Sequence, residues 1–190
     1  MEPIIFDLNE LVKQSTGFSY YILGRSYDLE ENGANQDYKK ALYWYQKGVD
    51  INYPLCLYSL GISYVLGLGD VLVIDKEKGQ KILTDVYSEI IKLIECSKTS
   101  KLEKLYARFV VGAYHYFGLG QIEKDYKKAF DIIKECADEG HIAAIYDLGA
   151  NFYYYGNGTQ INHELAKYYL NIAKEAGLKR AKDTIKSRRI

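Results

Sequence analysis

Residues 111–129 carry the pattern that predicts the fold: Val-Gly-Ala-Tyr-His-Tyr-Phe-Gly-Leu-Gly-Gln-Ile-Glu-Lys-Asp-Tyr-Lys-Lys-Ala. Apolar and aromatic residues recur at helical spacing up to Phe117, and the Gly-x-Gly motif at Gly118 and Gly120 is typical of a turn. Asp125 is a residue type that accepts hydrogen bonds from the free N–H groups at the start of a helix. The stretch therefore predicts a helix, a tight turn and a second helix.

The same pattern occurs four times. The first helix of each unit carries an apolar residue followed by glycine, at Leu23-Gly24, Leu60-Gly61, Val111-Gly112 and Leu148-Gly149. The second helix carries a small residue, at Ala41, Gly79, Ala129 and Ala166. The first and second units are 37 residues apart, as are the third and fourth, and an insertion separates the middle two. A period of this length indicates a solenoid, in which neighbouring helix pairs bury each other's apolar faces.

Capping residues indicate where the second helices begin and end. Each is preceded by a residue that can accept a hydrogen bond from the first helical turn: Asp37, Asp75, Asp125 or Asn162. Three of them are followed by a residue that readily takes the left-handed conformation: Asn52, Gly140 and Gly177. Caps, turns and periodicity agree, which strengthens the helical prediction.

Leu-Gly-x-x-Tyr, then Gly-x-Gly, then Asp-Tyr-x-Lys-Ala is very similar to the Sel-1-like repeat (SLR), a relative of the tetratricopeptide repeat. The resemblance covers about residues 18–180. It implies an all-α, right-handed α-solenoid of four helix-turn-helix repeats whose first helices line a concave surface. It also implies a protein that acts as an adaptor or scaffold. The pattern is broken at Glu30 and Asn32, which replace turn glycines, and at Gly79, which replaces alanine.

We expect a single domain over residues 1–190. Its predicted parts are an N-terminal cap at 1–17, repeat 1 at 18–52, repeat 2 at 53–84, an insertion at 85–104, repeat 3 at 105–140, repeat 4 at 141–177 and a basic C-terminal cap at 178–190. The insertion continues a helical apolar rhythm, which predicts extra turns on the two helices that flank it. The apolar loop 70–75 is either tucked beneath a neighbouring hairpin, which we favour, or exposed as a contact surface.

Composition narrows the classes of function. The 25 basic residues balance the 25 acidic ones, which argues against a general nucleic-acid binder. The first residues lack the basic start and long apolar run of a secretory signal, and no stretch approaches the roughly 18 apolar residues of a membrane span. Three widely spaced cysteines do not resemble a disulfide framework. We therefore expect a cytoplasmic protein with reduced thiols.

Residues with catalytic chemistry form no recognisable motif. His115, His141 and His163 lack the spacing of a zinc site, and no Gly-x-Gly turn continues as a phosphate-binding loop. His115 occupies a position that is aromatic in the other repeats, and Cys56 and Cys136 occupy positions that are otherwise small, which favours packing roles. The sequence predicts no catalytic residue, metal or cofactor. The less favoured alternative is a hydrolase, because some SLR proteins with paired cysteines have been credited with that activity.

The remaining function is binding to a protein partner along an aromatic face. If the repeats stack as in tetratricopeptide arrays, eight residues are expected to contact the partner: Tyr21, Arg25, Tyr58, Tyr106, Phe109, Tyr116, Tyr146 and Tyr153. Tyrosine provides a large amphipathic contact area and is enriched in binding hot spots. Alternatively, the aromatic residue three positions before each glycine only fills the seam between helices. Tyr106, Tyr116 and Tyr153 are then the stronger candidates.

The sequence leaves the identity of the partner open. A general adaptor that binds a complex subunit is the leading hypothesis, and the alternatives are an immunity protein that neutralises a bacterial toxin and a binder of extended peptides. Tyr154 and Tyr155 add to the tyrosines that the repeat does not require. The basic residues of 178–190 are interpreted as a solvated terminal cap rather than as a phosphate site.

Overall fold

The computed structural model describes residues 2–190. Within them the regular structure is helical, apart from one isolated bridge between Leu68 and Leu72. The chain divides into two compact units: unit 2 contains residues 6–103 and 119–121, and unit 1 contains residues 2–5, 104–118 and 122–190. The helical content confirms the predicted all-α class. This division into compact units does not test the expectation of a single domain over residues 1–190, which stays a prediction.

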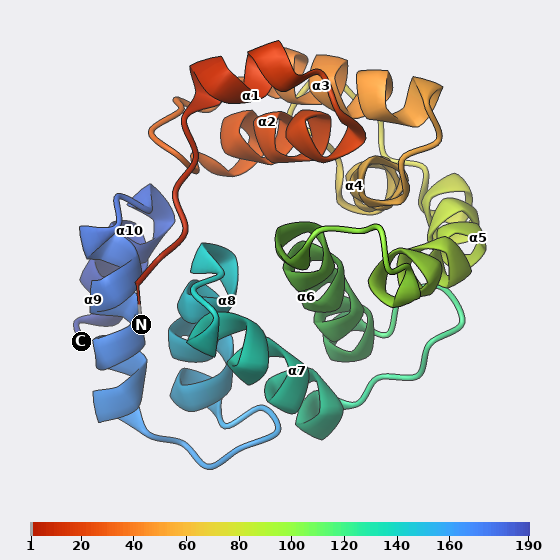
Figure 1. Ribbon diagram of the computed structural model, residues 1–190. Coiled ribbons are helices and arrows are strands. Elements are labelled where there is room, and N and C mark those ends of the chain that lie inside the picture. The colour runs from red at the N-terminus through yellow and green to blue at the C-terminus, as the bar shows by residue number, and fades with distance from the viewer. Residues whose placement is uncertain (1) are drawn as a thin grey trace. The chain divides into compact units, whose positions relative to one another are not determined.

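Unit 2 contains the first two helix pairs (Figure 1). The short helix α1 (Leu8–Gln14) precedes α2 (Gly17–Leu29) and α3 (Tyr38–Asp50), which pack against each other. The second pair consists of α4 (Pro54–Leu66) and α5 (Lys76–Glu95). Because α4 also contacts α2 and α3, both pairs share one core.

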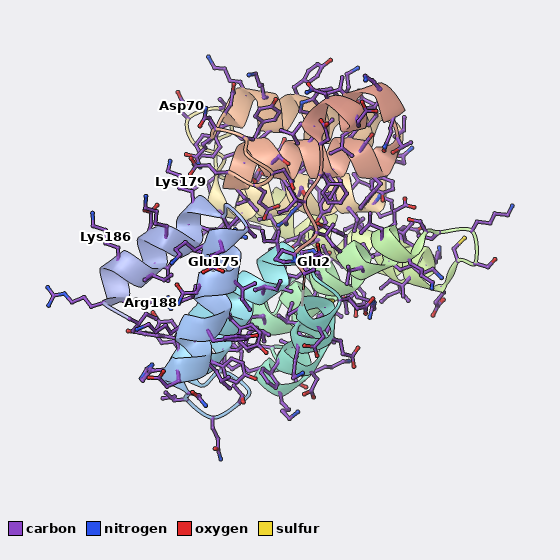
Figure 2. The ribbon with its side chains drawn as sticks, turned by 60° about the vertical axis from the view of Figure 1, so that its left-hand side comes forward. Glu2, Asp70, Glu175, Lys179, Lys186 and Arg188 are labelled. Carbon is purple, nitrogen blue, oxygen red and sulfur yellow. The ribbon has the colours of Figure 1, made fainter. Side chains whose placement is uncertain are left out.

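Unit 1 contains the other two pairs. The first consists of α6 (Lys101–Phe117), which enters unit 1 at Lys104, and α7 (Tyr126–Asp138). The second consists of α8 (Ile142–Asp147), its π-helical continuation η1 (Leu148–Tyr153) and α9 (His163–Glu175). The last helix, α10 (Lys179–Arg188), packs against α9, and Figure 2 shows Lys179 and Lys186 towards its opposite ends.

Side-chain and backbone caps define the ends of the second helices. Four side-chain oxygens each accept a hydrogen bond from the backbone N–H three residues further on: those of Asp37, Asp75, Asp125 and Asn162. Three residues after these helices have positive φ angles of 53°, 90° and 88°: Asn52, Gly140 and Gly177. The predicted caps are therefore confirmed, and each depends on contacts within a few residues.

The first repeat makes its turn without the glycines of the other repeats. Glu30 and Asn32 have φ angles of 54° and 53°, in the left-handed region. The Asn32 side chain donates to Ser26 Oγ at 2.8 Å and accepts a hydrogen bond from the Phe6 backbone N–H at 3.0 Å. These hydrogen bonds offset the strain of non-glycine residues in this conformation and hold the turn in place.

The insertion lengthens the helices on both sides of it. Helix α5 has 20 residues and α6 has 17, whereas α2, α3 and α4 have 13 each. The predicted extra turns are therefore confirmed. Among residues 2–190, no helix has both the length and the apolar content that crossing a membrane requires.

The apolar loop after α4 is more exposed than the favoured interpretation, a loop tucked beneath a neighbouring hairpin, predicted. Leu68 is buried, but Val73 and Ile74 expose 85% and 54% of their surfaces. The prediction that loop 70–75 is tucked away is therefore wrong for these two residues. The physical reason is the hydrogen bond from the Asp75 N–H to the Tyr64 carbonyl oxygen, 2.8 Å long, which returns the chain to the end of α4 and leaves the intervening side chains outside.

Candidate functional site

The residues predicted to contact a partner lie on the first helices of the repeats in both units, and most are buried. Six expose 9% of their surface or less: Tyr21, Arg25, Tyr58, Tyr106, Phe109 and Tyr153. Tyr116 and Tyr146 are half-buried. A buried side chain offers little surface to another molecule, so Tyr116 and Tyr146 alone among the eight keep an accessible side. The role of the set in partner binding stays a prediction.

Arg25 is part of an internal ion pair in unit 2. Its Nη2 and Nε atoms donate to the two carboxylate oxygens of Glu31 at 2.7 and 3.2 Å, and both side chains are buried. Burial alone lowers the pKa of Arg25, but the Glu31 carboxylate raises it well above its ordinary value, so the guanidinium stays charged. The guanidinium carbon lies 5.7 Å from the centre of the Tyr21 ring. Both predicted residues therefore contribute to the interior of the first repeat.

Tyr106 and Phe109 enclose a histidine in unit 1. Their ring centres lie 4.1 and 4.2 Å from that of His141. His141 Nδ1 in turn accepts a hydrogen bond from the Ala144 backbone N–H at 3.2 Å, which caps α8. These aromatic rings therefore fill the contact between α6 and the start of α8. This position fits the seam interpretation for Phe109, whereas Tyr106, which we favoured as a partner contact, is buried there as well.

Exposed aromatic side chains gather around Tyr116 in unit 1. Its ring centre lies 4.8 Å from that of Phe117 and 5.2 Å from that of Tyr126. Phe117 exposes 57% of its surface and Tyr126 exposes 37%. Tyr155, which is 56% exposed, lies two residues before Asn157, whose side chain donates a hydrogen bond to the Tyr116 hydroxyl. We refer to Tyr116, Phe117, Tyr126 and Tyr155 as the aromatic surface.

A loop of the fourth repeat holds Tyr116 in place. Asn157 Nδ2 donates to the Tyr116 hydroxyl at 2.8 Å and to the Asn151 carbonyl oxygen at 3.1 Å. Burial raises the pKa of Tyr116 and the Asn157 hydrogen bond lowers it, with a net increase that keeps the phenol neutral. Gly158, with a φ of 71°, lies directly against the Tyr126 carbonyl oxygen, where any side chain would collide. The loop therefore holds the Tyr116 hydroxyl by a hydrogen bond and packs against the backbone at Tyr126.

Arg188 of the last helix contacts the π-helical segment η1 and the two tyrosines that follow it. A π-helical turn displaces the usual backbone hydrogen bonds and is frequently found at functional sites. Here Arg188 Nη1 donates to the Ala150 carbonyl oxygen at 2.7 Å. The same guanidinium carbon lies 4.2 Å from the ring centre of Tyr154 and 4.9 Å from that of Tyr155. Arg188, labelled on α10 in Figure 2, thereby links the last helix to one edge of the aromatic surface.

Sequence reasoning did not select Phe117 or Tyr126. Tyr126 belongs to the repeat pattern, which gave it no special weight. Phe117 directly precedes a Gly-x-Gly turn, and so does Leu66 in the second repeat, which is 70% exposed. The available signal was therefore a large apolar residue at the last position of the first helix, where fewer neighbours cover a side chain.

No three His, Cys, Asp or Glu side chains among residues 2–190 are arranged to hold a metal ion. His115 is buried at its aromatic position, and burial lowers its pKa. Cys56 and Cys136 are fully buried, as their small-residue positions indicated, whereas Cys96 in the insertion is exposed.

Burial sets the reactivity of the thiols. It raises the pKa of Cys136 to about 12 and also raises that of Cys56, so neither is a thiolate near neutral pH. We expect a thiol reagent such as Ellman's reagent to modify Cys96 rapidly in the folded protein and the other two at least about a thousandfold more slowly. Urea should release all three. Cys96→Ser should abolish the rapid phase, and a second rapid thiol would contradict this assignment.

A protein-family model recognises the four repeats. The model of the Sel1 repeat matches residues 17–53, 54–83, 105–141 and 142–178. The chain belongs to the Sel1 repeat family. This membership confirms the resemblance to the SLR and the fold class of a helical solenoid of four repeats. Sel1 repeat proteins generally act as non-catalytic, protein-interaction modules.

Three solved structures of Sel1 repeat proteins resemble this chain. They are a Sel1 repeat protein from Oxalobacter formigenes (22% identity, TM-score 0.41), a protective antigen of uropathogenic Escherichia coli with an SLR fold (18%, 0.43) and a Sel1 repeat protein from Klebsiella pneumoniae subsp. pneumoniae (17%, 0.44). The matches cover 95%, 93% and 95% of this chain and 47%, 34% and 81% of the others. The chain thus spans less than half the length of the first two. No curated protein matches it significantly in sequence.

Proposed function

We propose that this Sel1 repeat protein binds a protein partner through the aromatic surface of unit 1. The observation that carries the proposal is the exposure of Phe117, Tyr126 and Tyr155 around the half-buried Tyr116. Aromatic side chains contribute large contact areas and dominate the energetics of many protein interfaces. The proposal keeps Tyr116 from the predicted contact set and replaces its buried members by exposed neighbours.

The contacts beneath the aromatic surface support a binding role. Asn157 orients the Tyr116 ring, and Arg188 stacks against Tyr155, so a partner need not order these side chains itself. A surface that is ordered before binding loses less conformational entropy in the complex. Exposed apolar side chains that are held in place in this way indicate an interface more strongly than isolated ones do.

We expect the double variant Phe117→Ala with Tyr155→Ala to lose most of its partner. Truncating interface aromatics commonly costs about 2 kcal/mol or more, or about a thirtyfold loss of affinity. Affinity purification of the tagged full chain from its native cells, quantified by mass spectrometry against the variant, measures this effect. The spectrum also identifies the partner, whether a complex subunit or a toxin.

The matched control is Tyr168→Ala, which removes an equally exposed tyrosine from α9. Circular dichroism establishes that all variants remain folded. If a protein recovered specifically with the wild type is recovered equally with the double variant, the aromatic surface is not the binding site. If nothing is enriched over an unrelated bait, the proposed function itself is wrong.

A further inference from the structure

The last helix of unit 1, α10, carries a concentration of positive charge. Three exposed lysines, spaced by three and four residues, share one side of this helix, and an exposed arginine directly follows its end. We refer to these four residues as the basic stripe: Lys179, Lys182, Lys186 and Arg189. Figure 2 shows Lys179 and Lys186 projecting away from the ribbon of α10.

The other side of α10 is attached to the rest of unit 1. Leu178 and Ala181 expose 1% and 0% of their surfaces, and α10 packs against α9. The Arg180 guanidinium carbon lies 4.6 Å from the ring centre of Tyr146, and Arg188 donates to the Ala150 carbonyl oxygen. The basic stripe therefore occupies the side of α10 that these contacts leave open to solvent.

Carboxylates neutralise only part of this charge. Residues 175–190 contain six basic residues and two acidic ones, the exposed Glu175 and Asp183. Even when both carboxylates are counted in full, positive charge remains in excess. Among residues 2–190, no carboxylate forms an ion pair with Lys182, Lys186 or Arg189.

Part of the positive charge is placed at a cost to the helix. The first turn of α10 contains Lys179 and Arg180 and no acidic residue, although the positive end of the helix dipole disfavours cations there. The dipole favours cations only in the last turn, which holds Lys186 and Arg188. Lys182 and Lys186 are four residues apart, a spacing at which like charges repel. A terminal cap needs only a polar outer face, which mixed charges would provide without this cost.

From these observations we propose that the basic stripe docks an acidic segment of a partner protein. The carboxylates of that segment pair with the exposed lysines and Arg189 and relieve the repulsion between Lys182 and Lys186. Single exposed ion pairs contribute little, so the segment must present several carboxylates together. Complementary charge of this kind speeds association and favours acidic partners over basic ones. The stripe shares no residue with the aromatic surface, so the two proposals stand or fall independently.

Two other anionic classes fit α10 less well. A helix that binds a membrane surface inserts an apolar face, but Leu178 and Ala181 are buried within unit 1. Sites for single-stranded nucleic acid offer aromatic rings for the bases to stack on, and here Arg180 and Arg188 already lie over Tyr146 and Tyr154. A protein segment needs neither feature, and protein interaction is the general role of the Sel1 repeat family.

Subtractive selection from a displayed library of random peptides tests the proposal. Peptides of about 15 residues, roughly 50 Å when extended, are first depleted on the double variant Lys182→Glu with Lys186→Glu. They are then selected on the immobilised full chain at about 0.15 M salt, which screens distant charges. We expect the enriched peptides to be net acidic. By fluorescence anisotropy with one labelled peptide, Lys182→Gln with Lys186→Gln should weaken binding about tenfold or more.

Two controls separate local charge from net charge and from the aromatic surface. Lys98→Gln with Lys101→Gln changes the net charge equally at exposed positions of unit 2, and Phe117→Ala changes the aromatic surface. Both should leave the affinity unchanged, with circular dichroism to establish that each variant remains helical. No enrichment, neutral or basic consensus peptides, or an equal loss in either control would each overturn the proposal. So would tighter binding of the full chain to oligouridine RNA or to phosphatidylserine vesicles than to the peptide.

Discussion

Replacing Glu31 by alanine is expected to lower the free energy of unfolding of unit 2 by about 3–5 kcal/mol. The carboxylate and the Arg25 guanidinium form a two-pronged contact at 2.7 and 3.2 Å, with 3% and 6% of the residue surfaces exposed. Removing the carboxylate takes the two-pronged hydrogen-bond partner from a buried guanidinium, so the cost of burying that charge is no longer offset by this pair. The turn at Glu30 and Asn32 is held by the same loop, so its strained residues lose support as well.

Urea denaturation followed by Trp44 fluorescence measures this effect. Trp44 is the only tryptophan and lies on α3, so its signal reports the unfolding of unit 2. The matched control is Glu10→Ala, which removes an exposed ion pair with Lys13 and should change stability little. Replacing both partners with apolar residues, Arg25→Met with Glu31→Leu, should recover much of the loss. Equal, small effects of Glu31→Ala and Glu10→Ala would contradict this account.

Gly79→Ala is expected to destabilise unit 2 although alanine is the residue of the repeat pattern. A Cβ at Gly79 would lie 2.7 Å from the Gly61 carbonyl oxygen and 2.7 Å from Val65 Cγ2. Both contacts come from α4, so the two helices would have to separate. Helix propensity alone predicts a gain of about 1 kcal/mol for this change. Overpacking of a close contact costs about 1–3 kcal/mol, and we expect this cost to exceed the gain.

The reciprocal change provides the control. Ala41→Gly, at the equivalent position of the first repeat, should lower the free energy of unfolding by about 1 kcal/mol, since it adds a helical glycine. Both variants lie in unit 2, so the same Trp44 measurement compares them. Two opposite substitutions at equivalent positions should therefore both destabilise. A higher urea midpoint for Gly79→Ala would show that α4 and α5 adjust to the extra methyl group without loss.

Much of the repeat architecture could be predicted from residue patterns. The cap at Asp125 and the left-handed residue at Gly140 depend on backbone groups only a few positions away. The extra turns of α5 and α6 follow from an apolar rhythm within single helices. These features could be predicted because the groups that interact to form them lie close to one another in the chain.

The candidate binding surfaces could not be predicted in the same way. Tyr153 and Tyr116 both looked available for a partner, but Tyr153 stacks on Tyr169 of α9 and is buried, whereas Tyr116 lies beside exposed Phe117. Residues 70–75 were an apolar loop with two possible positions. Which of these side chains faces solvent depends on helices that are distant in the chain and adjacent in the fold. The periodicity of 37 residues therefore specifies the helices and their caps, and packing between them determines which aromatic residues remain exposed.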